Sequence, residues 1–197
     1  MTADLILKQQ DAKASSLVSA YDLSFGYTEE LLFQGLTFQI QKGDRLWIRG
    51  RNGAGKSTLL RIISKNLPCE RVQYAENITM ETAFQEPLWT KGYLQDYLVD
   101  NEVRNLFFDI CHRLDLKHEV LKRPLETFSS GELKKIDLAR ALASPCQLLL
   151  LDEPLNFMDI YFREQLEKAI LSYQPTVVFV EHDEHFGNQV ATGEIRF

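Results

Sequence analysis

A glycine-rich run at residues 50–57 constrains the fold of this chain more than any other stretch. It reads Gly-Arg-Asn-Gly-Ala-Gly-Lys-Ser, it follows an extended stretch at 44–49, and an apolar, helix-forming stretch begins at Thr58. Glycines let successive backbone N–H groups point at one anion, and the N-terminus of a following helix adds partial positive charge. A glycine turn that merely precedes a helix is the simpler alternative, and a match over the whole run in this setting disfavours it. We therefore predict a phosphate-binding loop between a strand and a helix.

The same loop predicts a nucleoside triphosphate as the ligand. Lys56 can reach the β- and γ-phosphates, and the hydroxyl of Ser57 can ligate Mg²⁺. The predicted nucleotide-binding residues are Gly50, Asn52, Gly53, Ala54, Gly55, Lys56, Ser57 and Thr58.

Length and composition restrict the class of protein. With 197 residues, 45% of them apolar, the chain suits one ordinary domain and is short for two. No apolar run approaches the roughly 18–20 residues of a membrane helix, and the start of the chain lacks signal-peptide features, so we expect a cytoplasmic protein. The 3 widely spaced cysteines are typical of reduced thiols. The net charge of −6 argues against a broad grip on nucleic acid, so no direct DNA binding is expected.

The order of predicted elements indicates an α/β fold. Strands are predicted at 17–25, 34–40, 72–75, 78–83, 147–151 and 176–180, and helices after the glycine run, within 92–121, at 130–142 and at 157–173. A turn at 42–44 is predicted to close a hairpin into the strand before the glycine run. The near-continuous apolar strands at 147–151 and 176–180 are typical of a parallel sheet covered on both faces. We expect a mixed sheet flanked by helices, with antiparallel strands near the N-terminus and a helical insertion.

This order also predicts the domain organisation. The polar residues 1–16 are interpreted as a tail or linker remnant, and residues 17–197 as one nucleotide-binding domain. Within that domain, residues 17–89 and 144–197 are predicted to form the core, and residues 90–143 a helical subdomain.

An acidic pair supplies a second part of the predicted site. Asp152 and Glu153 directly follow the apolar run at 148–151, at the end of a predicted parallel strand, where ligands of open α/β sheets gather. Asp152 can hold Mg²⁺ through water, and Glu153 can orient and deprotonate an attacking water. An acidic turn after a strand is the alternative, and the nearby phosphate-binding loop favours hydrolysis.

A third motif opens the helix predicted at 130–142. Ser129, Ser130, Gly131 and Glu132 place small hydroxyls and a glycine at a helix start, which is an anion site with Ser129 or Ser130 as the N-cap. Taken alone, this pattern indicates only a good N-cap. Its position, about one helix upstream of the acidic pair, favours a role in the nucleotide site over a simple N-cap.

Together and in this order, the motifs resemble those of the ATP-binding cassette (ABC) family, from about Val18 to the C-terminus. The glycine run resembles the family's Walker A loop, 129–132 its signature sequence, 148–153 its Walker B strand and 154–159 its D-loop. Tyr27 resembles the aromatic that stacks on adenine, Gln85 the Q-loop glutamine and His182 the switch histidine. On the residues alone, Tyr27 could be an aromatic at the edge of the core, Gln85 a surface glutamine and His182 a structural histidine.

The resemblance implies an ATPase that requires Mg²⁺ and acts in a head-to-tail pair of cassettes. Each signature helix would contact the γ-phosphate of the ATP held by the partner's Walker A loop, so Ser129, Ser130, Gly131 and Glu132 would bind ATP across an interface. The second cassette would belong to the same protein or to a homodimer. Catalytic roles are implied for Glu153, His182, Gln85 and Lys56, and Mg²⁺ ligation for Ser57, Gln85 and Asp152. The family's usual signature has glycine at the position of Ser130 and glutamine at that of Glu132, so we expect a weaker γ-phosphate contact here.

Details of the loops resemble the F-type branch, whose members act on translation and include ribosome-protecting antibiotic-resistance proteins. The D-loop residues 156–159, Asn-Phe-Met-Asp, and the stretch from His182 to Phe186 carry this resemblance. Residues 152–160, with 175–176 and 180–183, look most like the second cassette of the resistance proteins. It implies the C-terminal cassette of a two-cassette protein. Contact with the ribosome would come from regions outside this chain or from a local patch, because the acidic balance offers little hold on RNA.

Two other functions remain open at this point. The motor subunit of a membrane transporter would have a membrane permease as its partner and would receive it near Gln85. An ATP-gated dimerisation head of a DNA-organising protein would need long coiled-coil heptads, and the sequence contains none.

Overall fold

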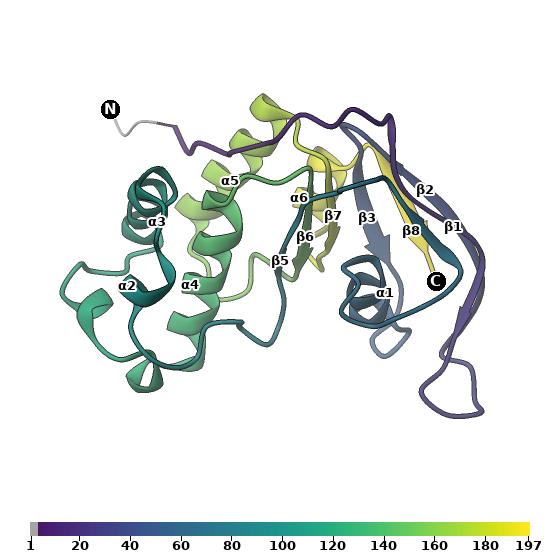
Figure 1. The fold of residues 1–197 in the computed structure, drawn as a ribbon, viewed down its shortest axis with the longest axis horizontal. Coiled ribbons are helices and arrows are strands. Elements are labelled where there is room, and N and C mark those ends of the chain that lie inside the picture. The colour runs from purple at the N-terminus through teal and green to yellow at the C-terminus, as the bar shows by residue number, and fades with distance from the viewer. Residues whose placement is uncertain (1–3) are drawn as a thin grey trace.

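The computed structural model describes residues 4–197, which form two sheets and the helices around them (Figure 1). A 3-stranded antiparallel sheet has the order β2-β1-β4, and a 5-stranded parallel sheet has the order β5-β6-β7-β3-β8. The strands are β1 (Ser16–Phe25), β2 (Phe33–Gln41), β3 (Arg45–Arg49), β4 (Val72–Tyr74), β5 (Met80–Ala83), β6 (Leu148–Asp152), β7 (Val177–Val180) and β8 (Gly193–Arg196). The helices are α1 (Lys56–Ile63), α2 (Leu94–Tyr97), α3 (Asn101–Arg113), α4 (Ser130–Ala143), α5 (Ile160–Tyr173) and α6 (Glu184–Val190), with 3-10 turns at Val120–Lys122 and Leu125–Thr127. The α/β class with an antiparallel sheet near the N-terminus is confirmed.

The parallel sheet is buried on both faces, as the apolar strands predict. Alternate residues of β6 point to opposite sides: Leu148 and Leu150 join a core with α1 and the antiparallel sheet, whereas Leu149 and Leu151 join a core with α3 to α6. Helix α1 therefore lies between the two sheets, and the remaining helices cover the other face (Figure 1). This arrangement brings the carboxyl ends of β3, β6 and β7 together at one edge.

The predicted hairpin at 42–44 is wrong. A turn does form there, with the Asp44 N–H donating to the Gln41 carbonyl (3.0 Å) and the Gln41 N–H donating to the Asp44 carboxylate (2.7 Å). However, β2 belongs to the antiparallel sheet, while β3 pairs in parallel with β7 and β8. Strand β3 carries Trp47 and Ile48, both almost fully buried, so it needs cover on both faces and occupies an inner position of the parallel sheet.

Part of the N-terminal segment is anchored to the domain, which differs from the expectation of a tail. Leu5 and Leu7 are buried in the helical core, and the Gln10 N–H donates to the carbonyl of Cys146 (2.8 Å). The segment runs across the molecule from the helices to the start of β1 (Figure 1). Its first 3 residues lie outside the described part.

The predicted helices form with a break or shifted ends, and α6 has no counterpart among the predictions. The helical stretch expected within 92–121 divides into α2 and α3, because Asp100 caps a new helix by accepting the Val103 N–H (2.9 Å). Helix α5 begins at Ile160 rather than at 157, because Asp159 is its N-cap and Phe157 has a positive φ of 67°. The 3 cysteines form no disulfide. Among residues 4–197, none of the helices combines the length and the apolar character that crossing a bilayer demands.

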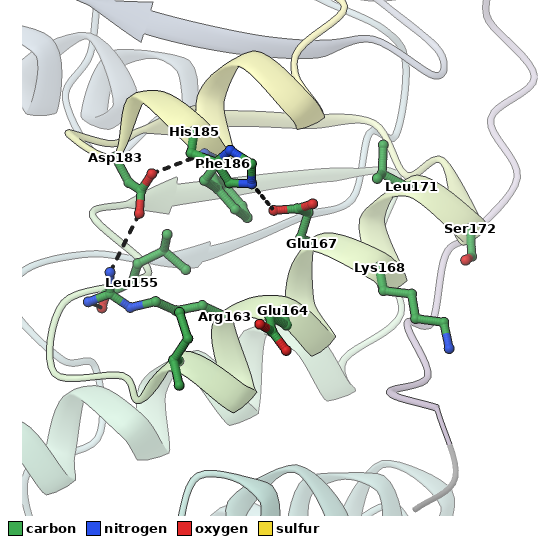
Figure 2. Close-up of a pocket in the computed structure, with 11 residues that line it drawn as sticks. Leu155, Arg163, Glu164, Glu167, Lys168, Leu171, Ser172, Asp183, His185 and Phe186 are labelled. Carbon is green, nitrogen blue, oxygen red and sulfur yellow. Dashed lines mark hydrogen bonds and ion pairs between the residues drawn. The ribbon is translucent and has the colours of Figure 1, made fainter.

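Helices α5 and α6 lie beside each other and enclose a surface pocket of about 500 Å³ (Figure 2). On one side of this pocket, Arg163 of α5 pairs with Asp183 at the start of α6 (3.5 Å). The connection from β6 to α5 passes next to this ion pair.

Candidate functional site

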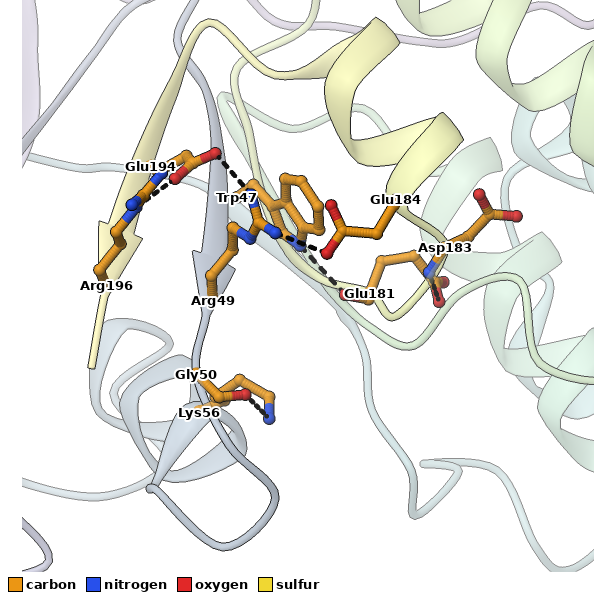
Figure 3. Close-up of polar contacts among 9 residues, drawn as sticks. All are labelled: Trp47, Arg49, Gly50, Lys56, Glu181, Asp183, Glu184, Glu194 and Arg196. Atoms are coloured by element: carbon orange, nitrogen blue, oxygen red, sulfur yellow. Dashed lines mark hydrogen bonds and ion pairs between the residues drawn. The ribbon is translucent and has the colours of Figure 1, made fainter.

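The glycine-rich run forms the predicted loop between a strand and a helix. Strand β3 ends at Arg49 and α1 begins at Lys56. Gly53 and Gly55 have positive φ values of 80° and 102°, which glycine adopts without strain, and a Cβ on Gly55 would lie only 2.8 Å from the ring of Phe33. The Lys56 ammonium lies over the loop and donates to the carbonyls of Gly50 (2.9 Å) and Arg51 (3.0 Å) (Figure 3). The loop thus presents one cation and the amino end of a helix to the same space.

A pocket of about 390 Å³ opens at this loop and brings several predicted residues together. Its lining contains residues from five places in the sequence: Tyr27, Leu32, Asn52, Gly53, Gly55, Lys56, Ser57, Thr58, Gln85 and Glu153. The ring of Tyr27 is 63% exposed, packs edge-on against Phe25 and hydrogen-bonds Thr58 through its hydroxyl (3.2 Å). Tyr27 and Gln85, which the sequence places far from the loop, therefore lie at the same pocket. Leu32 is an additional lining residue that no motif indicates.

Asp152 lies at the end of β6 with 7% exposure, and its chemistry fits a cation site. Burial raises the pKa of its carboxyl, and a hydrogen bond from Ser57 and the positive charge of Arg61 act in the opposite direction. One carboxylate oxygen, Oδ1, is buried without a hydrogen-bond partner among the described residues. A buried carboxylate oxygen of this kind is costly unless a cation or a donor satisfies it. Oxygen ligands are those that Mg²⁺ prefers, so Asp152 and Ser57 fit a magnesium ion.

Glu153 connects the strand end to two other parts of the site. Its Oε1 lies 3.3 Å from Nε2 of His182, which follows β7, and its other oxygen, Oε2, accepts from the side-chain amide of Asn156 (2.5 Å). Its backbone N–H donates to the carbonyl of Val180 (2.9 Å), and its φ is 54°, a strained value for a side chain with a Cβ. The structure therefore brings the predicted base and the predicted switch histidine into contact. The motifs did not assign Asn156 a role in the site.

The signature residues do not line this pocket. Ser129 caps α4 in a capping box: its hydroxyl accepts from the Glu132 N–H (3.2 Å), and the Glu132 carboxylate accepts from the Ser129 N–H (2.8 Å). Arg123 also pairs with Glu132 (3.2 Å). The Ser129 N–H, the Ser129 hydroxyl and then Arg123 hold the pKa of Glu132 below its ordinary value. The polar groups at this helix start thus bond one another within the chain.

A buried carboxylate next to His182 is the main feature that the sequence analysis missed. Glu181 is 7% exposed and accepts from the backbone N–H groups of Leu155 and His182. In the sequence, Glu181 is an acidic residue at the end of an apolar strand and part of the stretch 180–183 that resembles the resistance proteins. Neither feature indicates that its carboxylate is buried.

The arrangement matches a known family. The family model described as "ABC transporter" matches residues 33–156, which is more than half of the chain. This chain belongs to the ABC transporter ATPase-domain family.

Relatives within the ABC family extend over nearly the whole chain. ABC transporter F family member 5 of Arabidopsis thaliana is 30% identical over 92% of this chain and 28% of the relative. The zinc import ATP-binding protein ZnuC of Ehrlichia chaffeensis is 29% identical over 86% of this chain and 75% of the relative. A solved structure titled as the ATP binding subunit of an ABC transporter has a TM-score of 0.77 at 20% identity, covering 92% of this chain and 85% of that one.

These comparisons confirm the family and the cassette fold, and the relatives include members of the F family. Membership implies ATP binding and hydrolysis. The chain spans only 28% and 27% of the length of the two F family relatives.

Proposed function

We propose that this chain binds Mg-ATP in the pocket at residues 50–57 and hydrolyses it with Glu153 as the general base. The contact between Glu153 and His182 at 3.3 Å, beside the cation of Lys56, is the observation that carries the proposal. Tyr27 would stack on the adenine, and the loop N–H groups with Lys56 would bind the phosphates. Ser57, Asp152 and Gln85 would hold Mg²⁺, whose charge offsets that of the phosphates when it is bound.

The residues of this chain divide the remaining work between proton transfer and orientation. The carboxylate of Glu153 would accept a proton from the attacking water, because it is the acidic side chain in the pocket lining. His182 contacts that carboxylate through Nε2 and Asn156 through Nδ2, so both would hold it in one orientation. Gln85, exposed at the pocket, would complete the polar lining on the γ-phosphate side.

A second cassette would complete the site. The signature residues 129–132 lie outside the pocket of their own chain, which supports a head-to-tail pair in which they meet the nucleotide of a partner. In that pair, the Ser129 hydroxyl and the start of α4 would face a γ-phosphate. The carboxylate of Glu132 already accepts from Ser129, so this contact would be weaker than one made by an uncharged side chain.

We further propose that the longer protein is an F-type factor that acts at the ribosome, with this chain as its C-terminal cassette. The F family names of the relatives and the Asn-Phe-Met-Asp sequence of the D-loop support this assignment. A cytoplasmic location and a role in antibiotic resistance would follow from it. The net charge of −6 favours ribosome contact through other regions of the longer protein.

One observation favours a second candidate, the motor subunit of a membrane transporter. The zinc import relative aligns over 75% of its own length, a far larger share than that of the F family relatives. A permease would then be the partner.

Cosedimentation separates the two candidates. The complete reading frame that contains this chain would be expressed with Glu153→Gln, which preserves shape while removing the base. We expect the protein to sediment with ribosomes in ATP and not in ADP. Recovery with a membrane permease in detergent, without ribosome binding, would instead establish the transporter motor. Continued ATP hydrolysis at the parent rate would contradict the role of Glu153 in either setting.

A further inference from the structure

The D-loop, residues 154–159 between β6 and α5, is held at both backbone groups of one residue. The N–H of Leu155 donates to Oε2 of Glu181 (3.1 Å), and its carbonyl accepts from the guanidinium of Arg163 (3.1 Å). The same guanidinium donates through Nε to the carbonyl of Met158 (3.1 Å). Leu155 itself is 2% exposed, so both of its backbone groups are buried and satisfied by charged side chains rather than by a strand or a helix.

Glu181 also bonds to the loop between β7 and α6, residues 181–183, which contains His182 and is called the switch loop here. Its second oxygen, Oε1, accepts from the backbone N–H of His182 (2.7 Å), the residue whose side chain contacts Glu153. The backbone carbonyl of Glu181 accepts from the indole N–H of Trp47 (3.1 Å) (Figure 3). Trp47 is buried on β3, two residues before the end of the strand that leads into the phosphate-binding loop. The carboxylate of Glu181 therefore bonds to two segments, and its backbone carbonyl bonds to Trp47 on the strand that leads into the phosphate-binding loop.

Arg163 contacts the D-loop on its other side and connects it to the start of α6. It pairs with Asp183 (3.5 Å), which caps α6 by accepting the Phe186 N–H (3.0 Å) (Figure 2). A continuous circuit results, which runs from Glu181 through the backbone of Leu155 to Arg163 and Asp183. His182 lies between Glu181 and Asp183 in the sequence. The circuit links two loops that are 26 residues apart in the chain.

The circuit is connected to Glu153 through neighbouring residues of both loops and is not part of the nucleotide pocket. Glu153 and Asn156, which bond each other, lie within two residues of Leu155, and neither Glu181 nor Arg163 lines the pocket. A shift of the D-loop relative to the switch loop would change the 3.3 Å contact between Glu153 and His182. Misplacement of about 1 Å in such a group can cost roughly 100-fold in rate.

We propose that Glu181 and Arg163 are positioning residues that clamp the D-loop to the switch loop and so fix the orientation of Glu153 for hydrolysis. The inference rests on the proposed hydrolytic function of this same site. Glu181 accepts from the backbone N–H of Leu155, and Arg163 donates to the backbone carbonyl of the same residue.

Glu181→Gln tests the clamp with little change of size. A glutamine has one accepting oxygen and an NH₂ donor, so it cannot accept from the Leu155 and His182 amides through two oxygens. We expect kcat to fall by about 10–100-fold while the Kd for ATP stays within about twofold, because the pocket lining is unchanged. Amide hydrogen exchange followed by NMR should accelerate at Leu155 and stay unchanged in α1 and β6. Glu164→Gln, an exposed carboxylate on α5, is the matched control and should resemble the parent in all three measurements.

Each outcome decides for or against the clamp. An unchanged kcat in Glu181→Gln, or a loss of ATP affinity equal to the loss of kcat, would overturn the positioning role. Unchanged exchange at Leu155, in a parent that hydrolyses ATP, would contradict the clamp and leave the proposed function standing. All variants are therefore compared in the complete reading frame, and a parent of that kind without any turnover would contradict the proposed function itself, and the positioning role with it. If Glu181→Gln does not fold, Arg163→Lys keeps the charge but loses the two-armed geometry, and should show the same fall in kcat at unchanged Kd.

Discussion

The phosphate-binding loop and the start of the signature helix are both helix N-termini with small residues, and the structure treats them differently. At the loop, Lys56, Ser57 and the helix α1 face a pocket that also contains Gln85 and Glu153. At the start of α4, Ser129 and Glu132 satisfy each other, and none of residues 129–132 lines that pocket. The N-terminus of α1 therefore suits an external anion, whereas the N-terminus of α4 is already bonded to the carboxylate of Glu132.

The difference between these two helix N-termini indicates which of them depends on a ligand and which is stable without one. A helix start that is capped by its own chain is stable without a ligand, so it contributes to the cassette whether or not a partner is present. The loop at 50–57 instead holds its lysine against backbone carbonyls, which leaves that charge ready for phosphate oxygens. The comparison therefore predicts that substitutions at the loop change nucleotide binding, while those at 129–132 change stability in the isolated chain.

Loss of the loop cation should have the largest effect. We expect Lys56→Ala to abolish measurable ATP binding, because charge-assisted contacts to the phosphates, each worth about 1.5–3 kcal/mol, disappear together. Isothermal calorimetry provides the measurement, and turnover should vanish with the affinity. Lys117→Ala, at an exposed position, is the control and should bind like the parent. Unchanged affinity in Lys56→Ala would remove the phosphate-binding assignment.

Removal of the base should separate binding from chemistry. Glu153→Gln keeps the size of the side chain, so we expect ATP binding to persist while turnover falls by about 10²–10⁴-fold. Phosphate release measured at saturating ATP, beside calorimetry, tests both parts. On a sizing column with ATP, this variant should also show more dimer than the parent, because the nucleotide stays intact. Hydrolysis at the parent rate would assign the base to another residue.

Substitution at the signature should leave nucleotide binding in the isolated chain unchanged. We expect Ser129→Ala to keep its Kd for ATP within about twofold and to lower the free energy of unfolding by roughly 0.5–2 kcal/mol, the cost of a lost N-cap. Calorimetry and urea unfolding measure the two effects, with Ser172→Ala at an exposed position as the control. A tenfold loss of affinity would break the comparison, since it would place the signature at the nucleotide of its own chain.

The parts of the site that could be predicted are those whose geometry is local. The loop at 50–57 and the carboxylates after β6 are short motifs attached to a strand end, and the structure confirms their placement at one edge of the sheet. The hairpin at 42–44 was wrong because turn residues specify a reversal of the chain, whereas strand pairing depends on distant residues. Strand β3 pairs with β7 and β8, which the chain reaches only after more than 100 further residues.

The contacts of the clamp residues could not be predicted from the sequence for the same reason, because they join distant parts of the chain. Glu181 lies in the stretch 180–183 that carries part of the resemblance, but the sequence does not reveal its contact, because its main partner, the Leu155 N–H, lies 26 residues earlier. The burial of Leu5 and Leu7 was missed for a related reason: two apolar residues in a polar stretch do not reveal the surface that covers them. Long-range contacts of single residues become visible only once the fold is known.

The smallest effect concerns the acid stability that Glu132 contributes to the signature helix. Its pKa in the folded chain is held below the ordinary value of about 4.3, so its carboxylate stabilises the fold above that pH and the contribution is lost as the pH falls through the folded pKa. Glu132→Gln removes this dependence. We expect less than about 1 kcal/mol of lost stability at neutral pH, because the side chain is partly exposed, and a flatter decline in unfolding free energy below about pH 4.5. Urea unfolding at several pH values compares the two slopes, with Glu164→Gln as a control that keeps the parent slope. An unchanged acid slope in Glu132→Gln would mean that the carboxylate of Glu132 makes no net stabilising charge contact. The difference between this helix start and the phosphate-binding loop would then be one of geometry alone.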